Sequence, residues 1–258
     1  MCILFIAVKQ HADYPLIIAA NRDEFYARPT RISQFWDKPP DMLAGKDLQA
    51  GGTWMGVTRS GRIAALTNIR AGGEVSQART RGELVVNALT HTQPDAVFSE
   101  QLQRHRHQYN GYNLLYGDVM NLQVYNNAKN TLVPLQPGIH GLSNAHLNAP
   151  WPKVTRGMQA LTRYTCQHES LSVESLFTLL RDDHQAADHA LPDTGIGYEW
   201  EKMLSSIFIT SPNYGTRAST LLMVDSTGTV QWHERTFSDT GMPDAEQHHT
   251  FTLATSGR

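Results

Sequence analysis

Short apolar runs with many β-branched residues alternate with polar turns over the first 70 residues of the chain. Runs of this length and composition are typical of buried strands. Ser60-Gly61 suits the tight turn of a hairpin between two of them. Residues 29–50, by contrast, carry three prolines and mixed polarity, so we expect a long surface excursion there. The predicted strands of this part span residues 2–8, 16–20, 53–59 and 62–69.

Helical periodicity replaces this pattern in two later parts of the chain. Pro94 suits the first turn of a helix, and Ser172 suits an N-cap with Glu174 in the positive first turn. Residues 126–152 are rich in Asn, Pro and Gly and are expected to form a loop. The predicted helices span 81–91, 94–106, 153–168 and 172–182. The later predicted strands span 113–116, 122–125, 207–210, 220–225 and 230–237.

The order of these elements is strands, helices, strands, helices, strands, without βα alternation. This order argues against a doubly wound parallel sheet and favours antiparallel sheets with segregated helices, an α+β fold. We find no internal repeat and no convincing linker, so residues 1–258 are expected to form a single domain.

Composition and charge narrow the classes of partner. The net charge is −2, and charges of both signs are spread along the chain, so neither nucleic acid nor an anionic membrane is favoured electrostatically. No run approaches the roughly 20 apolar residues of a membrane helix, and we expect no membrane span. The apolar start lacks the basic region and length of a signal peptide. With only two cysteines, Cys2 and Cys166, the sequence favours a reducing, cytoplasmic location.

Common cofactor signatures are missing from the sequence. The glycines of residues 51–56 do not have dinucleotide-binding spacing and precede a strand, and no phosphate-binding P-loop occurs. The twelve histidines are scattered and lack acidic or cysteine partners at ligand spacing. We therefore expect no nucleotide cofactor and no structural metal, and a small molecule as the ligand.

Cys2 is the residue best suited to nucleophilic chemistry. Removal of Met1 would place an α-amine, with a pKa of about 8, beside the thiol, and such an amine can act as the base. The alternative to a catalytic Cys2 is a small apolar residue at the start of a strand.

The charged run Asn21-Arg22-Asp23-Glu24 follows directly on a predicted strand. Such a charged run is usually a solvated turn, yet beside Cys2 it could hold a thiolate or a carboxylate.

Short motifs from residue 1 to about residue 235 resemble one family in composition and order. They are Met1-Cys2, Ala20-Asn21-Arg22-Asp23-Glu24-Phe25, Arg28-Pro29-Thr30, Ala44-Gly45-Lys46-Asp47, Gly51-Gly52-Thr53-Trp54-Met55-Gly56, Ala65-Leu66-Thr67-Asn68-Ile69-Arg70, Tyr112-Asn113-Leu114, Gly141-Leu142-Ser143-Asn144, Trp151-Pro152-Lys153 and Tyr214-Gly215-Thr216-Arg217-Ala218-Ser219-Thr220. Each motif is short, but together they are highly specific. The chain resembles the NRDE family, also called the transport and Golgi organisation 2 family.

This family is similar to the N-terminal-nucleophile (Ntn) hydrolases, particularly bile-salt hydrolase and penicillin V acylase. The resemblance implies a four-layer αββα sandwich, in agreement with the order of elements above. It implies that Cys2 is the nucleophile, that Asn68 and Asn144 hold an oxyanion or orient an amine, and that Arg217 is a pocket arginine. The other expected site residues are Arg22 and Asp23 as catalytic groups, and Asn21, Glu24, Trp54 and Arg70 as ligand-binding groups.

The spacing of the charged run differs from that of the hydrolases. They space arginine and aspartate as Arg-Asn-x-Asp, whereas Arg22 and Asp23 are adjacent here. Consecutive residues of a strand point to opposite faces, so without a bulge or turn only one of the two can face Cys2.

Three functions follow as expectations from the resemblance. Members of the family are linked to intracellular haem mobilisation, and the altered spacing favours a binding and transfer role, with haem as the cargo. The alternatives are an N-terminal-cysteine amide hydrolase acting on a small acylated molecule, and a protein that handles lipid or acyl-CoA. No Cys-x-x-Cys-His attachment motif occurs, as expected for a carrier that releases its cargo.

Overall fold

Two antiparallel sheets form the centre of the molecule in the computed structural model, which describes residues 2–70 and 77–254. Within these residues one sheet has six strands in the order β10-β1-β2-β11-β12-β13. Its strands are β1 (Cys2–Val8), β2 (Leu16–Phe25), β10 (Gly138–Leu142), β11 (Tyr214–Val224), β12 (Thr229–Phe237) and β13 (Pro243–Thr252). The strand that begins at Cys2 therefore lies inside this sheet, between β10 and β2.

The second sheet has seven strands in the described part of the chain, in the order β3-β4-β5-β6-β7-β8-β9. Its strands are β3 (Thr30–Phe35), β4 (Met42–Asp47), β5 (Met55–Thr58), β6 (Arg62–Asn68), β7 (Tyr112–Asp118), β8 (Asn121–Asn126) and β9 (Thr131–Pro134). Each strand pairs with its neighbour in the chain, so the sheet is a meander.

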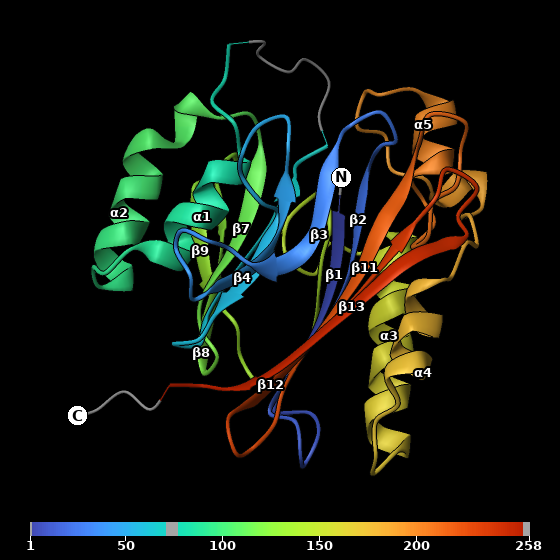
Figure 1. Cartoon of the computed structure of the whole chain (residues 1–258). Helices are drawn as coiled ribbons and strands as arrows, with labels where there is room; N and C mark the ends of the chain where they lie inside the picture. Colours follow the sequence, from blue (N-terminus) through green and yellow to red (C-terminus); the bar gives the residue numbers. More distant parts are fainter. Residues whose placement is uncertain (1, 71–76, 255–258) are drawn as a thin grey trace.

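Helices cover the outer face of each sheet (Figure 1). Helices α1 (Gly82–Thr90) and α2 (Asp95–His105) pack on the seven-stranded sheet, and α3 (Pro152–Gln167) and α4 (Val173–Leu180) pack on the six-stranded sheet. A short helix, α5 (Tyr198–Met203), and 3-10 turns at Arg106–Gln108 and Asp188–Ala190 complete the helical part. No helix in residues 2–70 and 77–254 is long and apolar enough to cross a membrane.

Side chains alternate between the two faces of each strand, and this alternation creates the layers. On β1, Leu4 and Ile6 point into the apolar core between the sheets, whereas Ile3 and Phe5 point to α3 and α4. Because both faces of β1 are covered, the strand is apolar throughout. The inner core and the two outer cores define four layers, αββα, so the predicted α+β sandwich is confirmed.

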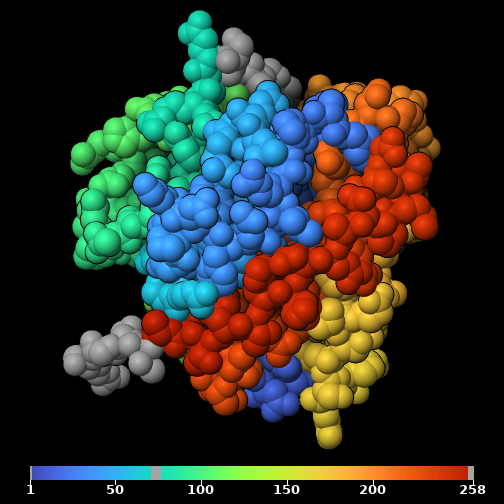
Figure 2. All heavy atoms as spheres, viewed as in Figure 1, coloured from blue at the N-terminus to red at the C-terminus, as the bar shows by residue number. Residues whose placement is uncertain are grey.

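The two sheets meet at the face shown in Figure 2, where the C-terminal strands lie beside residues of β3. Phe35 of β3 makes edge contacts with the rings of His249 and Phe251 of β13. Arg59 stacks on the Phe35 ring, with its guanidinium carbon 3.9 Å from the ring centroid. These contacts join the two sheets on this side of the sandwich.

Several segments differ from the sequence-based expectation. The predicted excursion 29–50 contains β3 and β4, and the predicted loop 126–152 contains β9 and β10. The predicted strand 207–210 is reduced to a single bridge between Thr210 and Gly215, and α5 and β13 were not predicted. Strand β2 continues to Phe25, so the run Asn21-Arg22-Asp23-Glu24 belongs to a central strand and is not a solvated turn.

Candidate functional site

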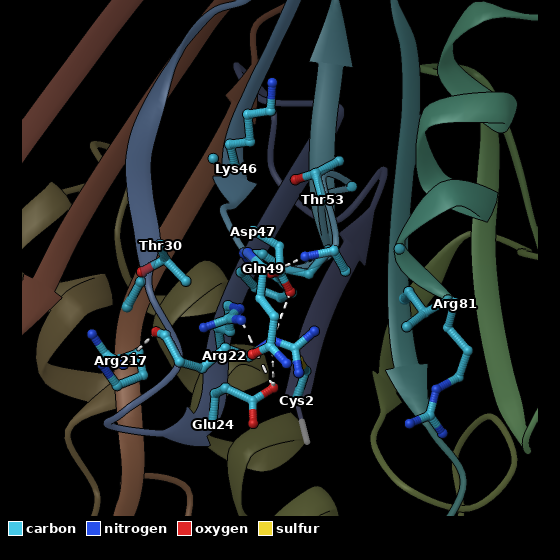
Figure 3. Close-up of a pocket in the computed structure, with 18 of the residues that line it drawn as sticks. Cys2, Arg22, Glu24, Thr30, Lys46, Asp47, Gln49, Thr53, Arg81 and Arg217 are labelled. Carbon is cyan, nitrogen blue, oxygen red and sulfur yellow. Dashed lines mark hydrogen bonds and ion pairs between the residues drawn. The ribbon is translucent and has the colours of Figure 1, made fainter. Parts of the chain in front are cut away.

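A cavity of about 540 Å³ lies at the end of the sandwich where β1 begins and β2 ends (Figure 3). The two sheets contribute opposite walls: Cys2, Arg22 and Arg217 come from the six-stranded sheet, and Lys46 and Asn68 come from the seven-stranded sheet. Because strand ends of both sheets converge there, residues far apart in the sequence share one chamber.

Cys2 is the first residue of β1 and lies at this chamber, with 7% of its surface exposed. It pairs directly with Arg22 of β2, and the backbone N–H of Asp23 donates a hydrogen bond to its thiol. Burial raises the pKa of the thiol to about 11, against the opposing effect of Arg22. The resting group is therefore a thiol, and a nucleophilic role requires a base.

Arg22 and Asp23 follow the alternation of side chains that is expected for a regular strand. The pairing of β1 with β2 has no register shift, and Arg22 lies opposite Cys2. Asp23 accepts a hydrogen bond of 2.8 Å from Thr216 Oγ1 and interacts with Lys153 of α3, on the helix side. Burial raises the pKa of Asp23, opposed by Lys153. Arg22 and Asp23 thus act on Cys2 from different sides.

Arg217 occupies a bulge in β11, where the register shifts between Thr216 and Ala218 opposite Asp23 and Arg22. The bulge turns the Arg217 side chain across the rim of the cavity (Figure 3). Its guanidinium donates to the carbonyl oxygens of Phe25, Tyr26 and Arg28. Arg217 therefore lies at the rim of the cavity, and its role there stays a prediction.

The carboxylates of Glu24 and Asp47 offset part of the positive charge of the arginine side chains at the cavity. Glu24 lies 3.8 Å from Arg22 and 3.9 Å from Arg28, and Arg28 donates to Asp47 at 2.7 Å. Arg22 is only 8% exposed, and its Nη1 has no hydrogen-bond partner among the described residues. A buried guanidinium nitrogen without a partner is costly, and an anionic ligand would satisfy it.

The two predicted oxyanion-hole asparagines have different environments. Asn68, at the end of β6, lines the cavity. Asn144 is fully buried, and its side-chain amide donates to the Asn68 carbonyl at 2.9 Å and accepts from Ser143. Asn144 therefore fixes the backbone beneath Asn68, and of the two side chains only that of Asn68 lines the cavity. Their roles in oxyanion binding stay predictions.

Of the four predicted ligand-binding residues, two line the cavity and two lie behind it. Glu24 and Trp54 line the cavity. Asn21 is buried behind it, donating to Leu180 and Ile207 carbonyls and accepting from Ser219. Arg70 forms a buried ion pair of 2.5 Å with Glu201 of α5 and stacks on Trp151. Asn21 and Arg70 therefore position the surrounding elements and do not line the chamber.

Two buried ionisable residues at the site were not among the predicted site residues, Lys153 and Glu234. Glu234 accepts a 3.0 Å hydrogen bond from the Ser33 N–H, and burial raises its pKa to about 7. A signal for it was available: Val230, Trp232 and Glu234 share one face of an alternating strand, so a carboxyl group stands in an apolar row. Lys153 stands directly after the helix-opening Pro152 and belongs to the family motif Trp151-Pro152-Lys153, but neither feature marked it as a site residue.

Cationic side chains dominate the lining. Among the described lining residues seven are Arg or Lys and four are Asp or Glu, so the chamber carries a surplus of positive charge. The cations are Arg22, Arg28, Arg31, Lys46, Arg79, Arg81 and Arg217. In Figure 3, Arg217 and Arg81 lie on opposite sides of the view with Cys2 and Arg22 between them. This arrangement suits an anionic small molecule that reaches the thiol.

The four-layer sandwich, with a cysteine at the first position of a central strand, defines an Ntn-hydrolase-like fold. The chain is similar to the crystal structure of the mutant C2A conjugated bile acid hydrolase from Clostridium perfringens, with a TM-score of 0.53. The match covers 98% of this chain and 92% of that chain at 8% identity. At this identity the likeness concerns the fold alone.

The sequence comparison defines the family. The profile of "Transport and Golgi organisation 2" matches residues 1–239. The Transport and Golgi organization protein 2 homolog of Homo sapiens is 36% identical, over 98% of this chain and 99% of that protein. Transport and Golgi organization protein 2 of Drosophila melanogaster is 28% identical, over 92% of this chain and 93% of that protein. The chain belongs to the Transport and Golgi organisation 2 family.

Proposed function

We propose that the protein binds a small anionic acyl compound in the cavity and presents its acyl carbonyl to the Cys2 thiol. The observation that carries this proposal is the surplus of guanidinium and ammonium groups around a single buried thiol. Arginine forks bind carboxylates and phosphates through paired charge-assisted hydrogen bonds. Arg22, with its unsatisfied Nη1, is the deepest such donor beside Cys2.

The chemistry available to this site is acyl transfer. The Cys2 sulfur attacks the acyl carbonyl, a thioester forms on the protein, and the thiol proton leaves with the amine or thiol that departs. Water then cleaves the thioester and restores the thiol. Cys2 is the one cysteine among the described residues that line the cavity, which supports its assignment as the nucleophile here.

Haem is the second candidate ligand, because its two propionates are anions that arginine side chains bind. The cationic lining favours it as well as the acyl compound. However, none of the described lining residues is a histidine or a methionine, and burial raises the pKa of Cys2 and opposes the thiolate that binds iron. We therefore place the anionic acyl compound first.

Both cysteines are free, which supports the proposal of a reducing, cytoplasmic setting.

Calorimetric titration of the full chain tests the proposal, with hexanoyl-coenzyme A as the anionic acyl probe. We expect binding of the probe, and no binding of neutral hexanamide at the same concentration. Arg22→Gln keeps the size of the side chain but removes its charge, and we expect affinity to fall about tenfold or more. Arg163→Gln, an exposed position on α3, is the matched control and should leave affinity unchanged.

Equal binding of the charged and neutral probes would contradict the proposal. A parallel titration with haem distinguishes the second candidate. A Soret shift at micromolar protein that Arg22→Gln weakens, together with no binding of hexanoyl-coenzyme A, would replace the acyl compound by haem.

A further inference from the structure

Strand β13 forms an edge of the six-stranded sheet. It spans ten residues, Pro243–Thr252, and in the described part of the chain it pairs with β12 alone. Its side chains are exposed from Pro243 to His248, and Figure 2 shows the C-terminal strands, in red, on the surface of the molecule. An edge strand presents a row of N–H and C=O groups with which a strand of another chain can pair.

The other sheet edges in residues 2–70 and 77–254 are shorter, and two of them are covered. Strand β10 has five residues and contacts α3. Strand β3 has six residues, and its Phe35 contacts the rings of His249 and Phe251 of β13. Strand β9 has four residues. Because the number of hydrogen bonds in a strand pair grows with its length, β13 is the edge best suited to pair with another chain.

The features that usually protect an edge strand are confined to the first half of β13. Proteins block such edges with proline, charged side chains or a bulge. In β13 these are Pro243, Asp244 and Glu246, with a shift of register beside them. The charge of Glu246 is already paired, because Arg235 of β12 lies 2.6 Å from it. Residues 247–252 contain no proline, lysine, arginine or acidic residue, so this half of the strand is open to pairing.

The sequence of β13 is complementary to itself. Residues directly opposite each other in an antiparallel pair point to the same face, so a twofold axis between two identical strands passes through a residue. The midpoint of β13 lies between Gln247 and His248. An axis at Gln247 places Glu246 opposite His248 of the second copy, twice, and each carboxylate can accept a hydrogen bond from an imidazole. An axis at His248 gives no such pair, and one at Glu246 opposes two carboxylates.

We propose that β13 pairs antiparallel with β13 of a second copy of this chain, about a twofold axis at Gln247. The contact joins the two six-stranded sheets edge to edge. Backbone hydrogen bonds provide the affinity, and the two Glu246–His248 pairs set the register. A strand pair buries less surface than the roughly 1,600 Å² of a standard interface, so we expect a dissociation constant in the micromolar range. Cys2 and Arg22 lie on the inner strands β1 and β2, so the proposed function does not depend on this contact.

Sedimentation velocity of the full chain over a series of micromolar concentrations tests this inference. We expect a monomer–dimer equilibrium in the parent protein. His248→Glu opposes two carboxylates at two points of the contact, and we expect it to raise the dissociation constant about tenfold or more. His107→Glu is the matched control. His107 is also exposed, in the 3-10 turn Arg106–Gln108, and this variant should dimerise as the parent does.

The exchange variant Glu246→His/His248→Glu tests the register. It places a histidine opposite a glutamate again, so the dissociation constant should return to within about threefold of the parent value. No recovery, in a variant whose far-UV circular dichroism matches that of the parent, would overturn the axis at Gln247. Should the exchange variant not fold, His248→Lys replaces it. Its ammonium lies opposite Glu246 and should strengthen the dimer, and an unchanged or weaker dimer would overturn the inference.

Three further results would overturn the inference. One is a parent protein that stays monomeric over the whole concentration range. Another is a dimer that His248→Glu leaves unchanged, because the contact would then lie on another surface. The third is an equal loss of the dimer in the control His107→Glu, because a change of charge anywhere on the chain would then have the same effect.

Discussion

Glu234 places an ionisable carboxyl group in the interior beside the cavity, and its protonation links stability to pH. Burial raises its pKa from the ordinary 4.5 to about 7, so between these values the native state holds a proton that the unfolded state has lost. The free energy of unfolding therefore falls as pH rises through this window. Below pH 4.5 both states are protonated, and this effect is absent.

We predict that Glu234→Gln removes this fall, because the amide stays neutral at every pH. At pH 8 the variant should be more stable than the parent by up to about 3 kcal/mol, and near pH 4 the two should be equal. Urea unfolding at both pH values measures the difference. Glu169→Gln, at an exposed position, is the control and should show no such pH dependence. A constant difference between Glu234→Gln and parent at both pH values would contradict the explanation.

Lys153 has the opposite dependence. Because burial lowers its pKa from 10.5 to about 7, the unfolded state binds more protons between these values, and the free energy of unfolding rises with pH there. Lys153→Met removes this penalty, and we predict that it stabilises the protein by about 2–4 kcal/mol at pH 6. Thermal unfolding at pH 6 measures it. A lower melting temperature for Lys153→Met would contradict the conclusion that this amine is costly to the fold.

At the scale of elements, α3 is positioned by a close approach to β1. Gly157 faces the Phe5 ring, and a methyl group at Gly157 would overlap that ring. We predict that Gly157→Ala destabilises the protein by about 1–3 kcal/mol, although alanine is the better helix former. Arg163→Ala, exposed on the same helix, is the control and should change the midpoint of urea unfolding little. A stabilised Gly157→Ala would show that α3 does not need this contact.

The elements that the sequence predicted are those with a strong apolar pattern. The central strands β1, β6, β7 and β12 and the helices α1 to α4 were all expected, because each buries a periodic face. Strands β3, β4, β9, β10 and β13 were missed, and all of them except β4 lie at an edge of their sheet. Edge strands carry polar residues and one exposed side, so their sequences lack the alternation that identifies a strand.

The candidate site, too, was predicted only in part from the sequence. Cys2, Arg22, Asn68 and Arg217 were expected at the site and line the cavity. Asn144, Asn21 and Arg70 lie behind it, because family motifs mark residues that position the site as well as residues that line it. Lys46, Arg79 and Arg81 were missed as lining residues, since only the assembled sheets and the segment before α1 bring them to Cys2.

For the whole molecule, the net charge of −2 hides a local surplus of cations in the cavity. The total charge speaks against polyanionic partners on the outer surface, but it does not describe the interior chamber. Low-dielectric walls concentrate the field of such a chamber and attract small anions to it. The affinity for the ligand should therefore fall as the salt concentration rises. The free energy of unfolding should not fall, because apolar cores mainly stabilise the fold.

In the proposed function, Cys2 attacks an acyl group that binds in this cationic cavity. The most direct measurement is the intact mass of the Cys166→Ser protein after brief mixing with hexanoyl-coenzyme A and acid quenching. We predict one added hexanoyl group, sensitive to hydroxylamine as a thioester is and absent in Cys2→Ala/Cys166→Ser. No acyl adduct and no release of coenzyme A, under conditions in which calorimetry shows that the probe is bound, would contradict this claim.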